Sequence, residues 1–254
     1  MTLVDGFYSS GVRVGIVGLG GIGHHHAERL ESLGADLVGG MDVDAGARER
    51  FVHEFDAHAF EDAGELYDMV DAVLITTPNR FHEDYAVSAL EWGLDVLLEK
   101  PLAHTLESAE RIAAAAREAD GICMVGFNNR FAAPVEVLKH YQGEGRFGNV
   151  RHVEANYVRR RGVPGRGSWF TTKDVSGGGS LIDIGVHAID LALYFLDFPE
   201  IVEVSGVARS EFGGRDDYTY IDMWGDDSGP EDFDVDDSVS AFIRTAEGAT
   251  VSLE

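Results

Sequence analysis

The sequence has few lysines, little positive charge and a single cysteine. Its 254 residues include 45 Asp and Glu against 17 Arg and three Lys (Lys100, Lys139 and Lys173), so the formal net charge is −25. Nucleic-acid backbones and anionic membrane surfaces are bound by clustered Lys and Arg. We therefore expect no nucleic-acid partner and no membrane partner.

The scarcity of cysteine and of apolar runs bears on where the protein works. Cys123 alone cannot form an internal disulfide and offers no metal-binding spacing. The start, MTLVDGFYSS, lacks the features of a secretory leader, and no apolar run approaches the roughly 20 residues that cross a bilayer. We expect a cytoplasmic protein without a metal site. The acid-rich, lysine-poor composition favours a halophilic proteome over an ordinary cytosol, because molar salt screens self-repulsion.

From residue 12 to residue 125, short apolar runs alternate with amphipathic stretches. The runs are VRVGIVGLG, ADLVGGMDV, DAVLITTP, LDVLLEKP and GICMVGF, and the stretches between them repeat apolar residues at helical spacing. Thr105 or Ser108 is the expected cap of the last helix. This alternation predicts βαβ units and a doubly wound parallel sheet, forming an α/β domain over residues 1–127.

The second half, residues 128–254, has a different pattern. The runs RHVEANYVRRR, IVEVSGVARSEF, DSVSAFIRTAEG and ATVSLE alternate in polarity and predict a mostly antiparallel open sheet in an α+β domain. One strong helix is expected over residues 178–196, with Pro199 just past its end. Between Glu211 and Asp237, 11 of 27 residues are acidic, which predicts a solvated loop.

A glycine-rich turn follows the first apolar run. Gly18, Gly20 and Gly23 form G-x-G-x-x-G between an expected strand and an expected helix, whose free N–H groups attract a pyrophosphate. Asp42 ends the second strand, where a carboxylate accepts hydrogen bonds from the adenosine ribose and repels a 2′-phosphate. The pattern predicts a dinucleotide cofactor, NAD in preference to NADP. The alternative is a glycine turn in an unrelated α/β protein.

Three consecutive histidines, His24, His25 and His26, follow this turn. Side chains of consecutive helical residues point in three directions and cannot converge on one ion. We therefore interpret them as part of a helix surface near the cofactor.

Three further patches carry polar side chains. Thr76-Thr77-Pro78-Asn79, with His82, follows the fourth strand, and Glu99-Lys100-Pro101 follows the fifth, so both lie where open α/β sheets bind ligands. The third patch is Gly177-Gly178-Gly179 with Asp183 and His187. Those last two residues, at i and i+4, share one helix face.

These motifs in this order resemble the glucose–fructose oxidoreductase, inositol dehydrogenase and rhizopine-catabolism (Gfo/Idh/MocA) family. The carrying segments are GLGGIGHHHA, TPN with His82, EKPLA at Glu99–Ala103, GFNNRF at Gly126–Phe131 and GGGSLIDIGVHAID at Gly177–Asp190. The resemblance implies an N-terminal Rossmann domain and a C-terminal domain whose sheet forms the substrate floor and often an oligomer interface. The expected cofactor contacts are Gly18, Gly20, Gly21, Ile22, Gly23, Asp42, Thr77, Pro78, Asn79, His82, Glu99, Lys100 and Asn128.

The resemblance also implies a catalytic set, Lys100, Asp183 and His187. Oxidising a sugar hydroxyl removes a proton from oxygen while hydride leaves the same carbon, and a neutral His titrates in the range that this proton transfer needs. We expect His187 to act as the base, Asp183 to orient it or relay the proton, and Lys100 to stabilise the developing charge on oxygen. Without the glycine turn and Lys100, a helix-surface pair would be the preferred interpretation of Asp183 and His187.

Basic and aromatic side chains suggest substrate contacts. Arg159, Arg160, Arg161 and Arg166 could hold a phosphate or carboxylate, although pairing with nearby acids is the favoured interpretation. Tyr157, Trp169 and Phe170 could form a wall under a sugar ring or pack in the core. The expected substrate contacts are Tyr157, Arg159 and Trp169.

The leading hypothesis is an NAD(P)-dependent oxidoreductase acting on a sugar, sugar derivative or cyclitol, with a homo-oligomer expected for the full-length protein. Two alternatives remain, a dinucleotide-sensing regulator without turnover and a glycosidase that uses tightly held NAD. Family members continue past a strand like ATVSLE, so we expect this chain to be C-terminally truncated.

Overall fold

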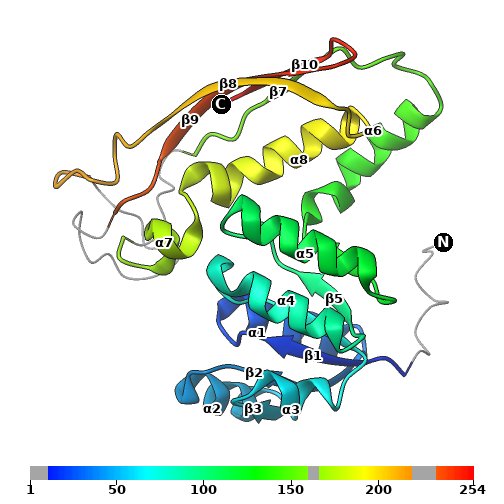
Figure 1. Cartoon of the computed structure of the whole chain (residues 1–254), viewed down its shortest axis with the longest axis vertical. Helices are drawn as coiled ribbons and strands as arrows, with labels where there is room; N and C mark the ends of the chain where they lie inside the picture. Colours follow the sequence, from blue (N-terminus) through cyan, green and yellow to red (C-terminus); the bar gives the residue numbers. More distant parts are fainter. Residues whose placement is uncertain (1–10, 160–165, 219–232) are drawn as a thin grey trace. The chain divides into compact units, whose positions relative to one another are not determined.

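The computed structural model describes residues 11–159, 166–218 and 233–254, and the chain divides into two compact units, Met1–Gly126 and Phe127–Glu254 (Figure 1). The first unit contains, in chain order, β1 (Arg13–Val17), α1 (Gly21–Ser32), β2 (Asp36–Met41), α2 (Ala45–Glu54), β3 (His58–Phe60), α3 (Ala63–Tyr67), β4 (Ala72–Ile75), a 3-10 turn (Asn79–Phe81), α4 (His82–Glu91), β5 (Asp95–Leu98), α5 (Leu106–Glu118) and β6 (Cys123–Val125).

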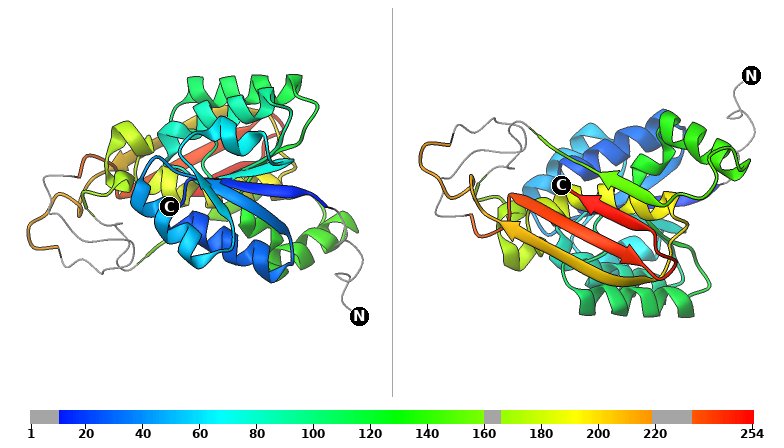
Figure 2. Two further views of the ribbon diagram at one scale, coloured as in Figure 1. Left: turned by 90° about the horizontal axis from the view of Figure 1, so that it is seen from below. Right: turned by 90° about the horizontal axis from the view of Figure 1, so that it is seen from above.

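The first unit is built on a parallel sheet with the order β3-β2-β1-β4-β5-β6. Helices cover both faces (Figure 2, left). The order reverses between β1 and β4, and in such sheets ligands bind beyond the carboxyl ends of the strands at the point of reversal. The predicted Rossmann architecture is confirmed. Thr105 is the cap of α5, because its hydroxyl accepts a hydrogen bond from Ser108 N at 3.2 Å.

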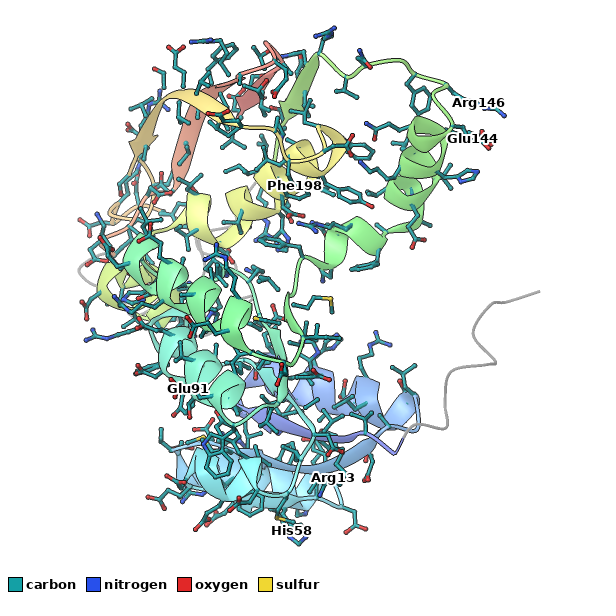
Figure 3. The ribbon with its side chains drawn as sticks, turned by 45° about the vertical axis from the view of Figure 1, so that its right-hand side comes forward. Arg13, His58, Glu91, Glu144, Arg146 and Phe198 are labelled. Atoms are coloured by element: carbon teal, nitrogen blue, oxygen red, sulfur yellow. The ribbon has the colours of Figure 1, made fainter. Side chains whose placement is uncertain are left out.

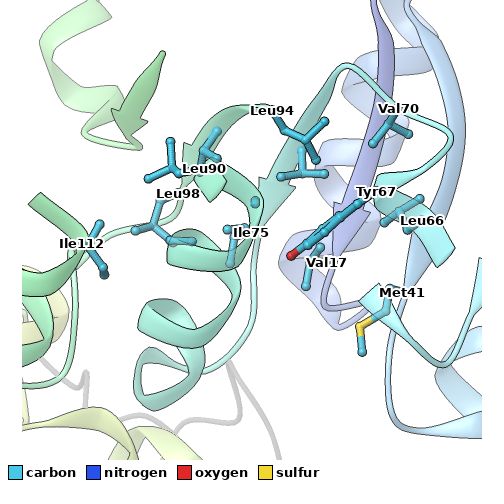
Figure 4. Packing of buried hydrophobic residues seen from close by; sticks show 14 residues of the cluster. Val17, Met41, Leu66, Tyr67, Val70, Ile75, Leu90, Leu94, Leu98 and Ile112 are labelled. Carbon is cyan, nitrogen blue, oxygen red and sulfur yellow. The ribbon is translucent and has the colours of Figure 1, made fainter. Parts of the chain in front are cut away.

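Two apolar clusters hold these layers together, one on each face of the sheet. The larger buries side chains of α3, α4 and α5 against the strands, and the smaller buries those of α1 and α2. Figure 4 shows the larger cluster, whose members include Val17, Met41, Leu66, Tyr67, Val70, Ile75, Leu90, Leu94, Leu98 and Ile112. Burial on both faces explains the nearly continuous apolar character of these strands.

The second unit contains a 3-10 turn (Asn128–Phe131), α6 (Ala133–Gly143), β7 (His152–Ala155), a 3-10 turn (Trp169–Thr171), α7 (Lys173–Ser176), a π-helical turn (Leu181–Gly185), α8 (Val186–Phe195), β8 (Ile201–Arg209), β9 (Ser238–Thr245) and β10 (Thr250–Leu253). Its sheet has the order β7-β10-β9-β8, with β7 and β10 parallel and the other pairs antiparallel (Figure 2, right). The predicted mostly antiparallel sheet is confirmed.

One face of this second sheet packs against α8. The cluster buries Ala192 of α8 with Ala155, Ile243, Val251 and Leu253 from three strands. By length and composition alone, the helical stretch Lys173–Phe195 is long and apolar enough to cross a membrane, which is weak evidence because the core helix of a globular domain meets the same criteria. Packing of α8 on the sheet gives its apolar residues a role in the core.

The acid-dense stretch fits its prediction only in part. Residues 219–232 lie outside the described part of the chain, and residues 211–218 are mostly exposed and outside helix and strand, as a solvated loop would be. Asp234, Asp236 and Asp237 have a further role that the sequence did not predict. Their carboxylates accept hydrogen bonds from backbone N–H groups of other segments, at Lys173, at Gly179 and Leu181, and at Glu211, Phe212 and Gly213. The sequence does not reveal this role, because a carboxylate that accepts hydrogen bonds from distant N–H groups cannot be told apart, by sequence, from an acidic residue on a solvated loop.

Candidate functional site

The glycine turn has the geometry that its sequence predicts. Gly18 has φ +97°, in the left-handed region that favours glycine, and a Cβ there would lie 2.8 Å from Thr77 N. At Gly23, on α1, a Cβ would lie 2.2 Å from Gly18 O, so only glycine allows the helix to approach the turn this closely. Together these residues place the N-terminus of α1 directly after β1.

Space for a cofactor lies on the other side of the turn. A Cβ built on Gly20 or on Gly21 meets no atom within 4 Å, and Gly20 precedes the first turn of α1. The N–H groups at such a helix start have no partner within the helix and attract a pyrophosphate. The Thr77 hydroxyl from the neighbouring strand end is buried and has no hydrogen-bond partner within the described residues. These features fit a dinucleotide.

Asp42 is anchored at the end of β2. Its Oδ2 accepts a hydrogen bond from Leu19 N at 2.7 Å and its Oδ1 accepts one from Asp44 N at 2.9 Å. The carboxylate is therefore held beside the glycine turn, with lone pairs left for a ribose hydroxyl. Arg48 Nη1 donates to the carbonyl oxygens of Asp42 and Val43, and its Nη2 pairs with Glu61.

His82 lies inside the first unit, with only 1% of its surface exposed. Its Nδ1 is 2.9 Å from Pro101 O and its Nε2 is 3.0 Å from Thr77 O. Burial lowers the pKa of His82 below its ordinary value, although hydrogen bonds to the backbone oppose the shift. We had expected a cofactor contact here. With both nitrogens facing carbonyl groups, His82 instead links the loops that follow β4 and β5.

Glu99 and Lys100 follow β5, and the Lys100–Pro101 peptide bond is cis. Glu99 Oε1 is 2.8 Å from His26 Nε2, and its Oε2 accepts a hydrogen bond from Lys100 N at 3.2 Å. Burial favours the neutral acid, but the hydrogen bond and charge of His26, with Lys100, hold the pKa of Glu99 below its ordinary value. Sequence reasoning missed His26 as the partner of Glu99, which lies 73 positions further along the chain.

The other two histidines of the run face elsewhere. His24 is 3.3 Å from Glu54, and the His25 residue is exposed. Within the described residues no group of three or more His, Cys, Asp or Glu could hold a metal ion.

In the second unit, Asp183 lies in the π-helical turn and His187 in the first turn of α8. Both are partly buried, and the His187 ring meets Phe127 edge-on with the centroids 6.2 Å apart. Single π-helical turns inside α-helices occur frequently at functional sites. The helix predicted over residues 178–196 thus begins later and with a wider turn than the periodicity indicates.

Asp236 fixes the start of this helix. Its Oδ1 accepts a hydrogen bond from Gly179 N at 2.8 Å, and its Oδ2 accepts hydrogen bonds from the Ser180 hydroxyl and from Leu181 N at 2.8 and 2.9 Å. The carboxylate satisfies N–H groups that would otherwise lack partners at the helix start. Asp236 was not predicted as a site residue, and only its place within the acid-dense stretch marked it in the sequence.

A cavity of about 380 Å³ lies within the second unit, beside this helix start. Tyr157, Arg159 and Asp183 line it, so three predicted site residues share one cavity. Arg159 Nη2 donates to the Tyr157 hydroxyl at 3.1 Å. Trp169 does not line the cavity, but it stacks on Phe170, which does, with the ring centroids 3.7 Å apart.

Of the other basic residues predicted near the substrate, only Arg166 lies within the described part of the chain. Arg160 and Arg161 lie outside the described residues. Arg166 is 4% exposed and donates to the carbonyl oxygens of Gly213 and Arg215, so backbone groups rather than an anion are its partners in the hydrogen bonds described. The two expectations for Arg166, a substrate anion and pairing with nearby acids, both stay predictions.

The GFNNRF segment enters the second unit through the 3-10 turn. Asn128, an expected cofactor contact, is exposed there. Arg130 forms a bidentate pair with the buried Asp190 of α8, and its guanidinium lies 5.0 Å from the ring centroid of Phe198. Figure 3 labels Phe198 at the end of α8. Arg130 therefore ties this segment to the helix that carries His187.

Comparison with known proteins agrees with this geometry. Residues 12–127 match the model of an oxidoreductase family with an NAD-binding Rossmann fold, so the first unit is an NAD-binding Rossmann domain. Residues 135–254 match the GFO/IDH/MocA C-terminal domain. The chain therefore belongs to the Gfo/Idh/MocA family of NAD(P)-dependent oxidoreductases, as its motifs predict.

Its relatives include sugar and cyclitol dehydrogenases. The chain is 32% identical to D-glucoside 3-dehydrogenase of Escherichia coli (strain K12), covering 97% of this chain and 70% of that protein. It is 33% identical to scyllo-inositol 2-dehydrogenase (NAD(+)) of Bacillus subtilis (strain 168), covering 78% and 57%. Levoglucosan dehydrogenase in complex with NADH and levoglucosan aligns with a TM-score of 0.79 and 28% identity, covering 95% and 66%. The chain thus spans 57% to 70% of the length of these relatives.

Proposed function

We propose that the protein transfers a hydride between a hydroxyl-bearing carbon of a sugar, sugar derivative or cyclitol and the nicotinamide of NAD. The observation that carries this proposal is the open space at Gly20 and Gly21, after β1, in the same parallel sheet in which Lys100 follows β5. A dinucleotide site at the same edge of the sheet as a lysine suits oxidation of an alcohol, because the ammonium stabilises charge that develops on oxygen. When bound, NAD supplies the hydride acceptor.

NAD is the proposed cofactor in preference to NADP. The anchored carboxylate of Asp42 favours a ribose with free hydroxyls and repels a 2′-phosphate. Arg48 is the nearby cation that could offset this repulsion, but it is engaged by two carbonyl oxygens and by Glu61. The expected cofactor contacts at the ends of β4 and β5 and at Asn128 remain part of this proposal.

The proposed catalytic residues are Lys100, Asp183 and His187. His187 accepts the hydroxyl proton while hydride leaves the same carbon, so the alcohol becomes a carbonyl and no charge is left unbalanced. Asp183 orients the imidazole or relays the proton, and Lys100 donates a hydrogen bond to the reacting oxygen. The helix start on which Asp183 and His187 lie is held by Asp236, which supports a fixed orientation for both.

We infer that the substrate carries no phosphate. Tyr157, Arg159 and Phe170 line the cavity of the second unit and offer a hydroxyl, a guanidinium and an aromatic ring to a sugar. Among the described lining residues, Arg159 is the cation, whereas four are acidic, Asp183, Asp236, Asp237 and Glu254. This balance disfavours a phosphorylated sugar and suits an uncharged polyol.

The amino-acid composition supports a proposal about the salt concentration in which the protein works. The net charge of −25 supports function in a saline cytoplasm, where screening weakens self-repulsion. We propose a homo-oligomer for the full-length protein.

An activity screen tests the function. Glucose, other sugars and inositols, each with NAD and NADP at low and molar salt, should give NADH with at least one uncharged polyol, and glucose 6-phosphate should be a poorer substrate than glucose. Tight NAD binding without turnover of any polyol would indicate a regulator. Cleavage of a glycoside without net NADH formation would indicate a glycosidase.

A further inference from the structure

The pair between His26 and Glu99 joins two parts of the first unit that the proposed function uses. His26 lies on α1, directly behind the glycine turn, and Glu99 directly precedes Lys100. Their side-chain atoms are 2.8 Å apart, and the two side chains are 23% and 25% exposed. Because a carboxylate only accepts hydrogen bonds, the Nε2 atom of His26 must carry the hydrogen.

Glu99 also contacts the backbone of Lys100. Its second oxygen accepts a hydrogen bond from Lys100 N, so one carboxylate bridges the histidine of α1 and the lysine after β5. A Cβ at Gly126 would lie 3.4 Å from Glu99 Oε2, in ordinary van der Waals contact, so the carboxylate also borders the segment that follows β6. A charge-assisted hydrogen bond in a partly buried site is stronger and more directional than one in water.

We propose that His26 is a positioning residue for Lys100. The imidazole of His26 fixes the Glu99 carboxylate, and this carboxylate accepts a hydrogen bond from the backbone N–H of Lys100. The contact therefore keeps α1, the proposed pyrophosphate-binding helix, in a fixed position relative to the loop that carries Lys100. A displacement of a catalytic group by about 1 Å can lower the rate about a hundredfold, so a contact that fixes the Lys100 loop would matter for catalysis. This inference rests on the proposed role of Lys100.

The histidine run provides its own control. His25 lies on the same helix and is exposed, so replacing it removes a histidine from α1 without touching Glu99. His26→Gln retains an N–H donor near the position of Nε2, whereas His26→Ala removes the donor. Comparing these three variants separates loss of the contact from loss of any histidine.

The first readout is amide hydrogen exchange in the segment 97–103, followed by mass spectrometry, and it needs no activity. His26→Ala should speed exchange in this segment about tenfold, with His26→Gln closer to the parent and His25→Ala unchanged. Parental exchange in His26→Ala, or equal acceleration in His25→Ala, would overturn the proposal.

The second readout separates positioning from cofactor binding. In His26→Ala, kcat should fall about tenfold or more, while the Kd for NAD, measured by calorimetry, changes less than about threefold, and His26→Gln should recover most of the rate. A parental kcat in His26→Ala would overturn the proposal, as would an equal loss in His26→Ala and His26→Gln. If no polyol is oxidised by the parent, the proposed function fails, and the exchange experiment still decides whether His26 holds the Lys100 loop.

Discussion

In the first unit, side chains are buried on both faces of a parallel sheet, in two apolar clusters of 14 and eight buried residues. Among the described residues of the second unit, one cluster of five buried residues covers a single face of a mostly antiparallel sheet. The second unit compensates with polar contacts between distant segments, such as Arg130 with Asp190 and Asp236 with the start of the π-helical turn.

This difference separates two sources of structure within one chain. Apolar burial is nondirectional and tolerates small changes, whereas a buried carboxylate satisfies particular N–H groups and no others. The first unit presents the proposed cofactor contacts on strand ends fixed by its core. The second unit presents Asp183 and His187 on a helix start fixed by one aspartate. We therefore expect the second unit to be the more sensitive to single polar substitutions.

The largest expected effects distinguish a catalytic role for the second unit from a cofactor-binding role for the first. His187→Ala should lower kcat by about 10²–10⁴-fold with the Kd for NAD unchanged, because it removes the proposed base and no cofactor contact. Gly20→Val should instead weaken NAD binding while the protein stays folded, since a side chain there meets open space in the protein. Steady-state kinetics and calorimetry measure both. A near-parental rate in His187→Ala, or parental NAD affinity in Gly20→Val, would contradict this division.

The next effect compares two ion pairs. Asp190→Asn should destabilise the second unit by about 3 kcal/mol, because the Asp190 side chain is 5% exposed and the change leaves Arg130 without its bidentate partner. The matched change in the first unit is Asp71→Asn, which breaks a pair with Arg13 in which both side chains are more than 40% exposed. We expect no measurable loss there. Chemical denaturation measures both, and equal losses would remove the contrast.

Local signals explain why so much of the first unit could be predicted. Five of the six strands there are the short apolar runs of the sequence, and the glycine turn joins β1 to α1 within six residues. The short strand β3 (His58–Phe60) and the helix α3 (Ala63–Tyr67) have no such signal and were not predicted. The turn geometry at Gly18 and Gly23 depends only on neighbours in sequence and on the adjacent strand end. The four strands of the second sheet were predicted as well, because their polarity alternates.

Contacts between residues far apart in the sequence account for what was missed. Nothing local distinguishes Asp236 from the other acids of its stretch, since its partners, Gly179 to Leu181, lie 55 to 57 positions away. His26 was interpreted as a helix surface for the same reason. Periodicity also cannot separate a π-helical turn from an α-helical one, so the start of the helix near Asp183 was placed too early.

A smaller effect compares two helix caps. Asp236→Ala removes hydrogen bonds to three groups at the start of the π-helical turn and should cost about 2 kcal/mol. Thr105→Ala removes the single cap of α5 in the first unit and should cost about 1 kcal/mol. Asp236→Ala should also lower kcat, because Asp183 and His187 follow directly, whereas Thr105→Ala should not. Equal kinetic effects would indicate that Asp236 has no special part in holding the site.

The smallest expected effect is a pH dependence of stability, and here the buried polar group, His82, lies in the first unit. His82 is buried with a pKa below its ordinary 6.5, so as the pH falls through 6.5 the unfolded chain binds a proton before the folded one does. Stability from this group is complete above that value and falls below it, by at most about 1.4 kcal/mol per pH unit. Glu83, whose pKa is lowered to about 2 by Arg111, loses its contribution only at much lower pH. Glu99 faces His82 and opposes the shift, which limits the slope. Denaturation at pH values from about 5.5 to 7.5 should give a flatter dependence in His82→Gln than in the parent, and identical slopes would show that His82 is not the titrating group.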